Sequence, residues 1–503
     1  MPAAMRPRTR PVRLVDVARV LDITVPARDA DAWSRIDVTG VTLDSRQVEL
    51  GDVYAALPGH VTHGARFAAD AVRLGAAAIL TDEVGSGALD DIGVPLLVVD
   101  APRTRLGAVA SFVYGNPASS LQLLAVTGTN GKTTVAAMVE SGLRASGRVT
   151  GMIGTVGVVI DQVVHAGART TPEATDLHAT LAMMVEAGVR SVVMEVSSIA
   201  LEEHRVDGVV YDVAAFTNLS QDHLDYHGTM QAYFEAKAGL FTAARARQAI
   251  IGVDDDWGKT LAEQCAIPYD TWSLLDPRAS WHGFRAASGL EVVGPDGARH
   301  RLDVPMPGSF NVANAICAFA ILVRAGVDPV DAARGISRVR VPGRMERFET
   351  AGVTGIVDYA HSPDAIERVL RAARDEYSGR IIAVVGAGGD RDRGKRPLMG
   401  QTAARLADLL VITDDNPRSE DPAAIRAAVR EGAQRVAPLE RAEIREEADR
   451  RAAITVAVGV AQAGDVVLVL GKGHEQGQDV GGVITPFDDA TVLARALAEG
   501  ASE

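Results

Sequence analysis

The segment QLLAVTGTNGKTTVAAMVESGLRA, residues 122–145, constrains the fold more than any other stretch of the chain. It joins an apolar run typical of a buried strand, a glycine-rich loop and a run with helical apolar spacing. A helix start offers unpaired N–H groups and the positive end of the helix dipole, which suit phosphate. The usual phosphate-loop pattern has a glycine five positions before Gly131, but Val126 stands there. The segment therefore predicts a nucleotide-binding unit of an unusual subclass; an ordinary glycine-rich turn is the alternative.

Strand-like and helix-like segments alternate along the rest of the chain. Strand-like runs include VYAAL, AAAILTD, SVVMEVSS, AAFTNL, GIVDYA, RIIAVVGAG, LLVITDD and DVVLVLG, with amphipathic helical stretches between them. This rhythm predicts an α/β chain with parallel sheets covered by helices. The pattern of these segments suggests three blocks, 1–103, 104–342 and 343–503, with the Pro-Gly pair of RVRVPGRMERF as a hinge.

Composition narrows the function classes. The net charge of −14 over 503 residues argues against general nucleic-acid binding. Apolar runs are too short to span a bilayer, and the basic N-terminus lacks the apolar core of a signal peptide. The two cysteines, Cys265 and Cys317, suit a reducing compartment. We expect a cytoplasmic monomer that acts on small molecules without membrane insertion.

Residues able to support phosphate chemistry follow the glycine loop. Lys132 can bridge the outer phosphates of a nucleotide, and Thr133 can reach Mg²⁺. Glu195 ends a predicted strand, and His223 lies in the segment FTNLSQDHLDYHG. Both residue types can hold or orient a metal near phosphate, although each is more often structural when taken alone. Lys237 lies on a predicted helix, where a solvated lysine is the alternative.

The ordered set of motifs resembles the Mur ligases over almost the whole chain. The motifs are TGTNGKTT, EVSS, FTNLSQDHLDYHG, the YFEAK lysine, GSFNVANAICA, PGRMERF, DYAHSPDA, GAGGDRDRGKRPLMG, DDNPRSEDP and GKGHEQ. The resemblance implies a three-domain Mur ligase architecture: a UDP-sugar-binding domain over 1–103, a central P-loop-type ATPase domain over 104–342 and a Rossmann-like, amino-acid-binding domain over 343–503. It also implies a peptidoglycan-precursor ligase. ATP phosphorylates the carboxylate of UDP-MurNAc-L-Ala-D-Glu, and an amino-acid amine displaces phosphate from the acyl phosphate.

By resemblance, one set of residues handles ATP and Mg²⁺. The ATP-binding positions are Gly128, Thr129, Asn130, Gly131, Lys132, Thr133, Thr134, Asn311, Arg344 and Asp358. Thr133, Glu195, His223 and Lys237 match metal-site positions, Lys237 as a carbamate; Lys132, Glu195, His223 and Lys237 are the catalytic candidates. Carbamylation needs a neutral amine, so a lowered lysine pKa would help. A helix cap is the alternative for Asn311.

A second set matches the positions that hold the UDP-MurNAc-dipeptide. These are Leu43, Ser45, His60, Val61, Thr62, Thr170, Thr171, Ser197, Glu203 and Arg205. The chain departs from the family pattern at Ile199, where the family usually has histidine, and at Glu203, where it often has glutamine. An added negative charge beside an anionic substrate is unexpected; His204 and Arg205 are candidates to screen it.

A third set predicts which amino acid is added. Arg391, Asp415, Asn416, Pro417, Arg418, Gly471 and Glu475 match a meso-diaminopimelate pocket. Arg418 can clamp the distal carboxylate and Glu475 can pair with the distal ammonium. An ordinary strand-to-helix loop is the alternative for the Asp-Asn-Pro-Arg stretch.

Several alternatives stay open at this point. The added amine can be lysine, ornithine or diaminobutyrate. The same three-domain plan serves folylpolyglutamate synthase. A non-catalytic nucleotide-binding regulator and a P-loop GTPase or motor complete the alternatives.

Overall fold

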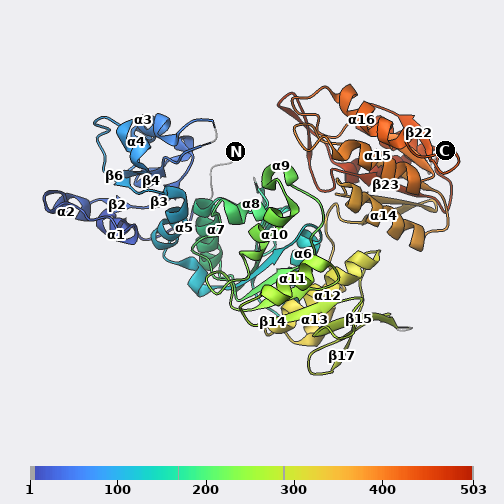
Figure 1. The fold of residues 1–503 in the computed structure, drawn as a ribbon, viewed down its shortest axis with the longest axis horizontal. Coiled ribbons are helices and arrows are strands. Elements are labelled where there is room, and N and C mark those ends of the chain that lie inside the picture. The colour runs from blue at the N-terminus through green and yellow to red at the C-terminus, as the bar shows by residue number, and fades with distance from the viewer. Residues whose placement is uncertain (1–5, 60, 168, 287–288, 501–503) are drawn as a thin grey trace.

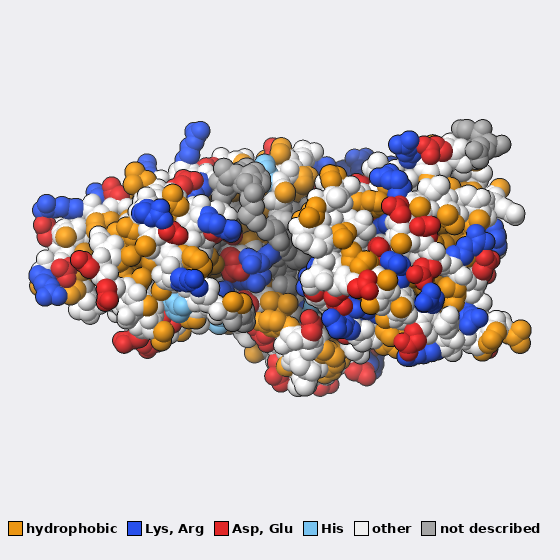
Figure 2. Space-filling model, turned by 90° about the horizontal axis from the view of Figure 1, so that it is seen from above, with side chains coloured by type: hydrophobic (Ala, Val, Ile, Leu, Met, Phe, Trp, Pro, Cys, Tyr) orange, Lys and Arg blue, Asp and Glu red, His pale blue; other side chains and the backbone are white. Residues whose placement is uncertain are grey.

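The computed structural model describes residues 6–59, 61–167, 169–286 and 289–500. Figure 1 shows three lobes in chain order along the longest axis, each built around its own sheet. The first lobe lies at one end, the central lobe in the middle and the third lobe at the other end. Within the described residues, no helix combines the length and the apolar character that a membrane span requires. Lys, Arg, Asp and Glu side chains are interspersed over the face drawn in Figure 2.

The first lobe contains a four-stranded parallel sheet in the order β3-β4-β5-β6. Its strands are β3 Gly40–Thr42, β4 Asp52–Ala55, β5 Ala78–Thr81 and β6 Leu96–Val98, and a small antiparallel pair adds β1 Val12–Arg13 and β2 Asp37–Val38. Its helices are α1 Leu14–Val20, α2 Ala27–Ser34, α3 Ala68–Leu74, α4 Glu83–Gly87 and α5 Pro102–Val113. β4 and β5 are buried along their whole length, as expected for strands covered on both faces.

The central lobe contains an eleven-stranded sheet in the order β10-β9-β8-β11-β7-β12-β13-β14-β15-β16-β17. The strands are β7 Gln122–Thr127, β8 Thr150–Gly154, β9 Gly157–Ile160, β10 Val163–His165, β11 Ser191–Glu195, β12 Val213–Phe216, β13 Ala249–Gly252, β14 Tyr269–Ser273, β15 Trp281–Ala286, β16 Gly289–Val293 and β17 Arg299–Leu302. The helices are α6 Lys132–Ala145, α7 Ala174–Glu186, α8 Ser198–Glu202, α9 Leu224–His227, α10 Met230–Ala238, α11 Asp256–Gln264, α12 Ser309–Arg324 and α13 Pro329–Ile336. The middle strands are parallel and the outer ones antiparallel, so the nucleotide loop after β7 leaves from the parallel centre.

The third lobe contains a six-stranded sheet in the order β18-β19-β23-β20-β21-β22, parallel except for β18. The strands are β18 Glu346–Thr350, β19 Val353–Asp358, β20 Ile381–Val385, β21 Leu409–Ile412, β22 Glu443–Glu446 and β23 Val466–Leu470, and a separate hairpin pairs β24 Gly477–Val480 with β25 Val483–Pro486. The helices are α14 Pro363–Glu376, α15 Lys395–Leu406, α16 Pro422–Gln434, α17 Arg450–Gly459 and α18 Asp489–Gly500. Because β20, β21 and β23 are parallel neighbours, the loops that follow them meet at one edge of the sheet.

The predicted fold class is confirmed: parallel sheets flanked by helices form the core of all three lobes. The apolar runs singled out in the sequence became strands because continuous Val, Ile and Leu suit a sheet covered on both faces. The boundaries after residues 103 and 342 stay predictions. Leu106 and Val113 of α5 pack with Leu14 and Leu80, so this helix contributes to the core of the first lobe.

Candidate functional site

The glycine loop links β7 to α6, as the sequence predicted, and two glycines make its shape possible. Gly128 has φ +143° and Gly131, which precedes α6, has φ +86°. A Cβ at Gly128 would lie 1.9 Å from Thr217 Oγ1, and one at Gly131 would lie 2.3 Å from Asn314 Oδ1. Only glycine therefore fits these two positions without moving the neighbouring strand loop and α12.

The segment after β12 holds this loop in place. The Thr129 amide donates to the Asn218 carbonyl at 2.8 Å, and the Asn130 amide donates to Asn218 Oδ1 at 3.1 Å. Thr217 Oγ1 donates to the Asn130 carbonyl at 2.6 Å. These bonds satisfy loop groups on the sheet side and leave the N-terminus of α6 free of a side-chain cap. The helix start is therefore available to an anion.

Lys132 remains at the loop. Its Nζ donates to the carbonyls of Gly128 at 2.9 Å and Thr129 at 2.8 Å. Burial lowers the pKa of Lys132, while the carboxylates of Glu195 and Asp222 act in the opposite direction. The ammonium thus lies against the loop that the sequence assigned to phosphate.

Glu195 ends β11 and lies beside the first turn of α6. Its side chain is 1% exposed and accepts bonds from Thr133 Oγ1 at 2.9 Å and from the Thr155 amide at 2.8 Å. Thr155 Oγ1 donates to the same carboxylate at 3.1 Å. The carboxylate and the Thr133 hydroxyl form a pair of hard oxygen donors beside the phosphate loop.

This pair fits a magnesium ion. The described residues contain no group of three or more His, Cys, Asp or Glu arranged to hold a metal. Mg²⁺ in nucleotide sites usually takes one or two protein ligands and completes its shell with phosphate and water. Thr133 and Glu195 meet that requirement without a third protein ligand.

Lys237 lies on α10 beneath the same loop. It is 1% exposed, its Nζ donates to the Gly128 carbonyl at 2.9 Å, and it lies 4.5 Å from the centre of the Tyr233 ring. Burial lowers the pKa of Lys237 well below its usual value, and the neighbouring charge of Lys132 acts in the same direction. The side chain is therefore not a solvated surface lysine, and its lowered pKa favours the neutral amine that carbamylation requires.

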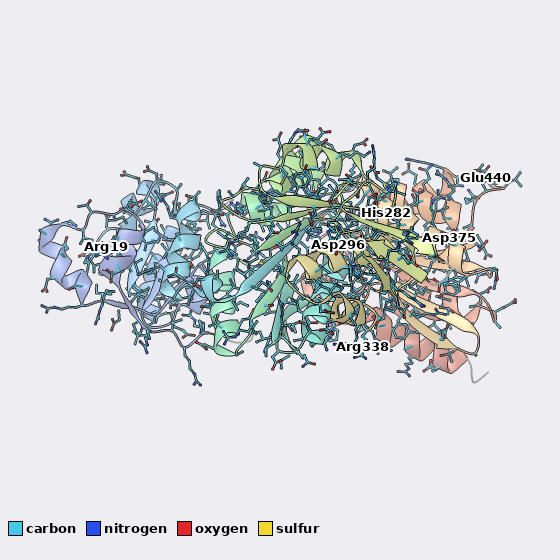
Figure 3. All side chains as sticks on the ribbon, turned by 90° about the horizontal axis from the view of Figure 1, so that it is seen from below. Arg19, His282, Asp296, Arg338, Asp375 and Glu440 are labelled. Atoms are coloured by element: carbon cyan, nitrogen blue, oxygen red, sulfur yellow. The ribbon has the colours of Figure 1, made fainter. Side chains whose placement is uncertain are left out.

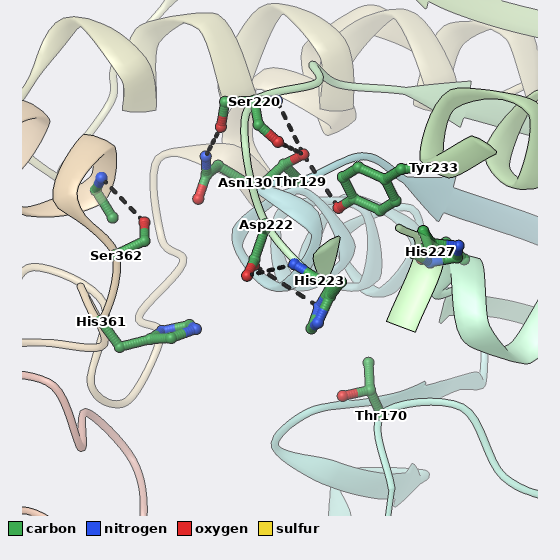
Figure 4. Close-up of polar contacts among 12 residues, drawn as sticks. Thr129, Asn130, Thr170, Ser220, Asp222, His223, His227, Tyr233, His361 and Ser362 are labelled. Atoms are coloured by element: carbon green, nitrogen blue, oxygen red, sulfur yellow. Dashed lines mark hydrogen bonds and ion pairs between the residues drawn. The ribbon is translucent and has the colours of Figure 1, made fainter. Parts of the chain in front are cut away.

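The region around His223 joins the central and third lobes. His223 adopts φ +52° and its Nε2 lies 3.7 Å from Asp222 Oδ2. Burial lowers the pKa of His223, with Asp222 opposing the shift. Figure 4 shows His361, from the third lobe, pointing toward Asp222, and Thr170 on the opposite side of His223. Burial lowers the pKa of His361 to about 4.

The predicted dipeptide residues lie around Glu195. Thr171 Oγ1 donates to the Glu195 carbonyl at 2.9 Å, and the Ser197 amide donates to Thr171 Oγ1 at 3.1 Å. Thr170 Oγ1 lies 3.2 Å from Thr155 Oγ1. Thr170, Thr171 and Ser197 are therefore brought to one place next to the predicted metal ligand.

Arg205 belongs to a group of three arginines around one carboxylate. Arg205, Arg103 and Arg169 each lie within 3.2 Å of a Glu173 oxygen. Burial lowers the pKa of Arg205, while the charge of Glu173 raises it. Glu173 was not predicted from the sequence, because its partners come from three separate segments.

The predicted screening of Glu203 was partly wrong. Glu203 accepts from Tyr226 at 3.0 Å and pairs with Arg103 at 3.4 Å. The His204 ring instead pairs with Asp207 at 2.8 Å. Its left-handed backbone, φ +55°, lies at the turn where α8 ends. The charge of Glu203 is balanced from α5, an element that sequence proximity does not indicate.

The predicted uridine residues follow parallel strands of the first lobe. Leu43 follows β3 and packs against the core of this lobe, and Ser45 begins a short 3₁₀ turn. Val61 and Thr62 are exposed in the loop after β4. His60 lies outside the described residues. The carboxyl ends of parallel strands are a common place for a ligand crevice.

Asn311 and Asp358 have structural partners. Asn311 lies inside the first turn of α12 and its Nδ2 donates to the Pro307 carbonyl at 2.7 Å, whereas Gly308 occupies the cap position. The helix-cap alternative for Asn311 is therefore wrong. Asp358 accepts from the amides of Met345 and Ala360, both at 2.8 Å. Burial raises the pKa of Asp358, while Arg344 lowers it.

Contacts between the central and third lobes converge on the nucleotide loop. Arg344 donates to Thr133 Oγ1 at 3.2 Å, and its guanidinium lies 4.4 Å from the Tyr359 ring centre. Asn130 Nδ2 and Ser220 Oγ donate to Asp364 Oδ2 at 3.2 Å and 3.1 Å. Arg344 was predicted to lie here, but Asp364 and Tyr359 were not. Asp364 stands far along the chain from the loop it contacts, and Tyr359 contacts Arg344.

The third-lobe pocket lies at the carboxyl ends of β20, β21 and β23. Arg418 has φ +51° and donates to the Gly389 carbonyl at 2.6 Å. A Cβ on Gly388 would lie 3.1 Å from the Arg418 guanidinium and 3.9 Å from Arg391 Cγ, so both arginines flank this glycine. Gly471 has φ +115°, and a Cβ at this position would lie 2.6 Å from Asp415 Oδ2. Glycine therefore leaves room for the Asp415 carboxylate. The structure thus brings the predicted pocket residues together.

Glu475 and Asn416 form a hydrogen-bonded pair in this pocket. Asn416 Nδ2 donates to Glu475 Oε2 at 2.7 Å. Lys472, which sequence reasoning left without a role, donates to Asn416 Oδ1 at 3.0 Å and to Glu475 Oε2 at 3.2 Å. The signal for Lys472 was present in GKGHEQ, but only the burial of its side chain sets it apart from a surface lysine.

A separate surface cavity of about 540 Å³ is lined by none of the predicted site residues. Asp375 and Glu440 line it, and Figure 3 shows both in the third lobe, away from Arg19 of the first lobe. The predicted site residues lie instead around the glycine loop and Glu195, in the strand loops of the first lobe and at the strand ends of the third lobe.

The three lobes and the phosphate loop define the class of protein: a multidomain nucleotide-binding enzyme in which the third lobe contacts the glycine loop of the central lobe. Three family profiles match the chain in order: "Mur ligase family, catalytic domain" at residues 37–114, "Mur ligase middle domain" at 126–322 and "Mur ligase, glutamate ligase domain" at 343–473. The chain therefore belongs to the Mur ligase family, and it is an ATP-dependent ligase that forms amide bonds.

Individual relatives agree with the family assignment. The chain is 48% identical over 501 residues to the UDP-N-acetylmuramoyl-L-alanyl-D-glutamate–2,6-diaminopimelate ligase of Streptomyces coelicolor, covering 97% of this chain and 98% of the relative. It is 47% identical over 477 residues to the ligase of the same name from Corynebacterium glutamicum, covering 92% of each. A solved structure of a ligase with that name matches with a TM-score of 0.67 and 32% identity, covering 97% of this chain and 99% of that one. This family membership excludes a stand-alone GTPase or motor.

Proposed function

We propose that this protein uses ATP to join meso-2,6-diaminopimelate to UDP-MurNAc-L-Ala-D-Glu during peptidoglycan precursor synthesis. The observation that carries the proposal is the position of Arg418 and Arg391 around Gly388, beside Asn416, whose side chain binds Glu475. Two arginines and a carboxylate match an amino acid whose distal end has both a carboxylate and an ammonium. The relatives named as diaminopimelate ligases support the same substrate.

The residues around the glycine loop are proposed to bind ATP. The start of α6 and Lys132 would hold the phosphates, with Arg344 beside Thr133 from the third lobe. Asn311 and Asp358 are assigned to the same nucleotide by position. Mg²⁺ held by Thr133 and Glu195 would neutralise charge on the phosphate oxygens.

The carbamate of Lys237 is proposed as an additional anionic group near the metal. Its lowered pKa and full burial support that modification, and the Gly128 carbonyl fixes its position. The fourth metal-site candidate, His223, lies close to Asp222 at the edge of the same region. We assign Lys237 and His223 to holding and orienting, because neither has the geometry of a nucleophile with an adjacent base.

The first chemical step transfers a phosphoryl group. The dipeptide carboxylate, next to Thr170, Thr171 and Ser197, attacks the γ-phosphorus of ATP, ADP leaves, and an acyl phosphate forms. The neutral amine of the amino acid then attacks the acyl carbon; the C–N bond forms, the C–O bond to phosphate breaks, and inorganic phosphate and a proton are released. The barrier falls through positioning and charge neutralisation, so a nucleophilic Ser or Cys is not needed.

Arg205 is proposed to orient the dipeptide end. Its Nε lies 3.0 Å from Glu173, and two further arginines share that carboxylate. The cluster of Arg103, Arg169 and Arg205 with Glu173 and Glu203 keeps one positive charge in excess. Such an excess favours an anionic substrate group.

A ligation assay tests the proposed substrate. Purified protein is incubated with ATP, Mg²⁺, UDP-MurNAc-L-Ala-D-Glu and one amine: meso-diaminopimelate, lysine, ornithine or diaminobutyrate. Product formed at least ten times faster with meso-diaminopimelate supports the proposal. Equal or faster use of lysine contradicts it and favours the lysine-adding alternative. Ligation of glutamate to a folate would favour the folylpolyglutamate alternative.

A cytoplasmic setting is also proposed. Cys265 and Cys317 are free thiols, which suits a reducing cytoplasm. A monomer is proposed because one chain carries all the predicted site residues. We also propose that the domains divide after residue 342 and at α5, whose first turn contains residue 103.

A further inference from the structure

Lys472 is a buried cation that the proposed chemistry does not use. It follows Gly471 directly after β23, and its side chain is 0% exposed. A buried ammonium is unfavourable unless it is paired and hydrogen-bonded. Its partners therefore indicate what it does.

Those partners are pocket residues from two different loops. Lys472 Nζ donates to Asn416 Oδ1 at 3.0 Å and to Glu475 Oε2 at 3.2 Å, and lies 3.6 Å from Asp415 Oδ1. Asn416 Oδ1 also accepts from the Asp479 amide at 3.0 Å. Lys472 thus ties the loop after β21 to the loop after β23 and to the hairpin.

The contact changes what Glu475 offers a substrate. Its Oε2 accepts from Asn416 at 2.7 Å as well as from Lys472. The carboxylate already faces a positive charge from the protein itself. A substrate ammonium that approaches Glu475 must therefore share it with Lys472.

The local charges favour one kind of side-chain end. Lys472 places a positive charge directly beside the carboxylates of Glu475 and Asp415. An end group with both a carboxylate and an ammonium is neutral overall and can pair with each sign. An end group with an ammonium alone meets the like charge of Lys472 at Glu475, and such repulsion is an effective means of rejecting a wrong partner.

Arg450 shows that burial alone does not produce this effect. It is also fully buried near the pocket, but it makes two bonds to Asp489, at 2.8 Å and 2.7 Å, and both side chains are 0% exposed. Asp489 cancels its charge. Lys472 has no dedicated counter-ion of this kind, because its carboxylate partners belong to the pocket.

We propose that Lys472 is a positioning residue that sets amino-acid specificity: by pairing with Glu475 it excludes side chains that end in an ammonium alone and favours those that also carry a carboxylate. This inference rests on the proposed function, since it concerns the same diamino-acid pocket. It adds a residue that acts through Glu475 and Asn416 without contacting the reacting atoms.

The test compares Lys472→Met and Lys472→Gln with the wild type. Methionine keeps much of the side-chain volume without charge, and glutamine also keeps a donor. Lys259→Met is the matched control, because Lys259 is exposed on α11 and pairs with Asp256. For each protein, kcat/KM is measured for meso-diaminopimelate and for lysine, together with KM for ATP and for UDP-MurNAc-L-Ala-D-Glu.

We expect the ratio of kcat/KM for diaminopimelate over lysine to fall at least tenfold in Lys472→Met and by a similar factor in Lys472→Gln. The KM values for ATP and the UDP-dipeptide should stay within twofold, and Lys259→Met should match the wild type. An unchanged ratio, or equal losses for every substrate, would overturn the inference. Failure of both variants to fold would do the same, because it would assign Lys472 to folding.

The wild-type measurement separates this inference from the proposed function. A wild type that does not prefer diaminopimelate over lysine contradicts the proposed function, whatever the variants do. A wild type with that preference, combined with variants that retain it, contradicts only the role of Lys472.

Discussion

The nucleotide loop and the third-lobe pocket are built in opposite ways. The loop is one continuous stretch, residues 128–134, whose shape depends on two glycines with positive φ and on backbone groups at a helix start. The pocket combines loops after three strands, and its properties depend on charged side chains such as Arg418 and Lys472. Backbone groups are present whatever the side chains are, whereas a charge pattern changes with a single substitution.

The two regions therefore have separate roles in the reaction. The loop supplies phosphate chemistry that does not depend on which amino acid is added. The pocket supplies the choice of amine. Variants of the loop should therefore change the rate with every amine, whereas variants of the pocket should change kcat/KM for one amine. Variants of the contacts between the two regions should have only small effects.

The largest effect is expected at the loop. Lys132→Met should lower kcat about 10³-fold with diaminopimelate and with lysine alike, since it removes a cation aimed at developing phosphate charge. Steady-state phosphate release with each amine measures this. Circular dichroism checks that the fold is retained. A loss of kcat confined to one amine would contradict the proposed separation of roles.

A smaller and more selective effect is expected at the pocket. Arg418→Gln should lower kcat/KM for diaminopimelate by a factor equivalent to about 2–5 kcal/mol, because a substrate carboxylate loses its paired cation. KM for ATP should change less than about twofold. Arg393→Gln is the control, since Arg393 is exposed and pairs with Glu420 at 3.2 Å. A comparable rise in KM for ATP would show that the two regions are not separable.

The contact between the central and third lobes should respond to pH through His474. Burial lowers the pKa of His474 to about 4, the charge of Arg344 acts in the same direction, and a hydrogen bond to the Thr155 backbone opposes both. When the lobes separate, this pKa should return toward about 6.5. The arrangement in which the central and third lobes are in contact is then fully favoured above about pH 6.5. Its free energy relative to separated lobes becomes less favourable by about 1–2 kcal/mol as pH falls from 7 to 5.

Small-angle scattering across this pH range measures the change. The radius of gyration of the wild type should rise at low pH. His474→Gln, which cannot gain the proton, should show a smaller rise. Identical curves for the two proteins would exclude His474 as the responsible group.

The smallest effect is expected at the direct link between loop and third lobe. Asp364→Asn should raise KM for ATP about two- to fivefold, because the Asp364 carboxylate is partly exposed and such contacts contribute less than about 1 kcal/mol. Glu367→Gln, on the same helix and paired with Arg371, is the control. An effect as large as that of Lys132→Met would place the third lobe within the phosphate site itself.

The strand order explains why sequence reasoning recovered the loop more fully than the pocket. Gly128, Lys132 and Thr133 are adjacent in the chain, so their spacing alone indicates a strand, a phosphate loop and a helix start. Lys472 and Asn416 are 56 positions apart and meet only because β23, β20 and β21 are neighbours in the sheet. Their contact has no local signature in the sequence.

The residues that pair with the Glu203 charge likewise have no local signature in the sequence. Its sequence neighbours His204 and Arg205 were the obvious candidates to screen it. The charges of Arg205 and Glu203 do interact, but the direct contacts to Glu203 come from Arg103 of α5 and from Tyr226. The turn after α8 directs His204 toward Asp207. Neighbours along the chain point in different directions wherever a helix ends, so proximity in sequence is a poor guide to charge pairing.

The sequence by itself determined the alternation of strands and helices, the phosphate loop and the residues suited to each chemical task, because periodicity and glycine conformation are local properties. Only the tertiary structure decided that Lys472 lies under the pocket, that Glu173 gathers three arginines and that Asp364 reaches the loop. These contacts depend on which strands pair and how the lobes meet. Burial then makes the charges strong, since a cation removed from water interacts with its partners far more than one on the surface.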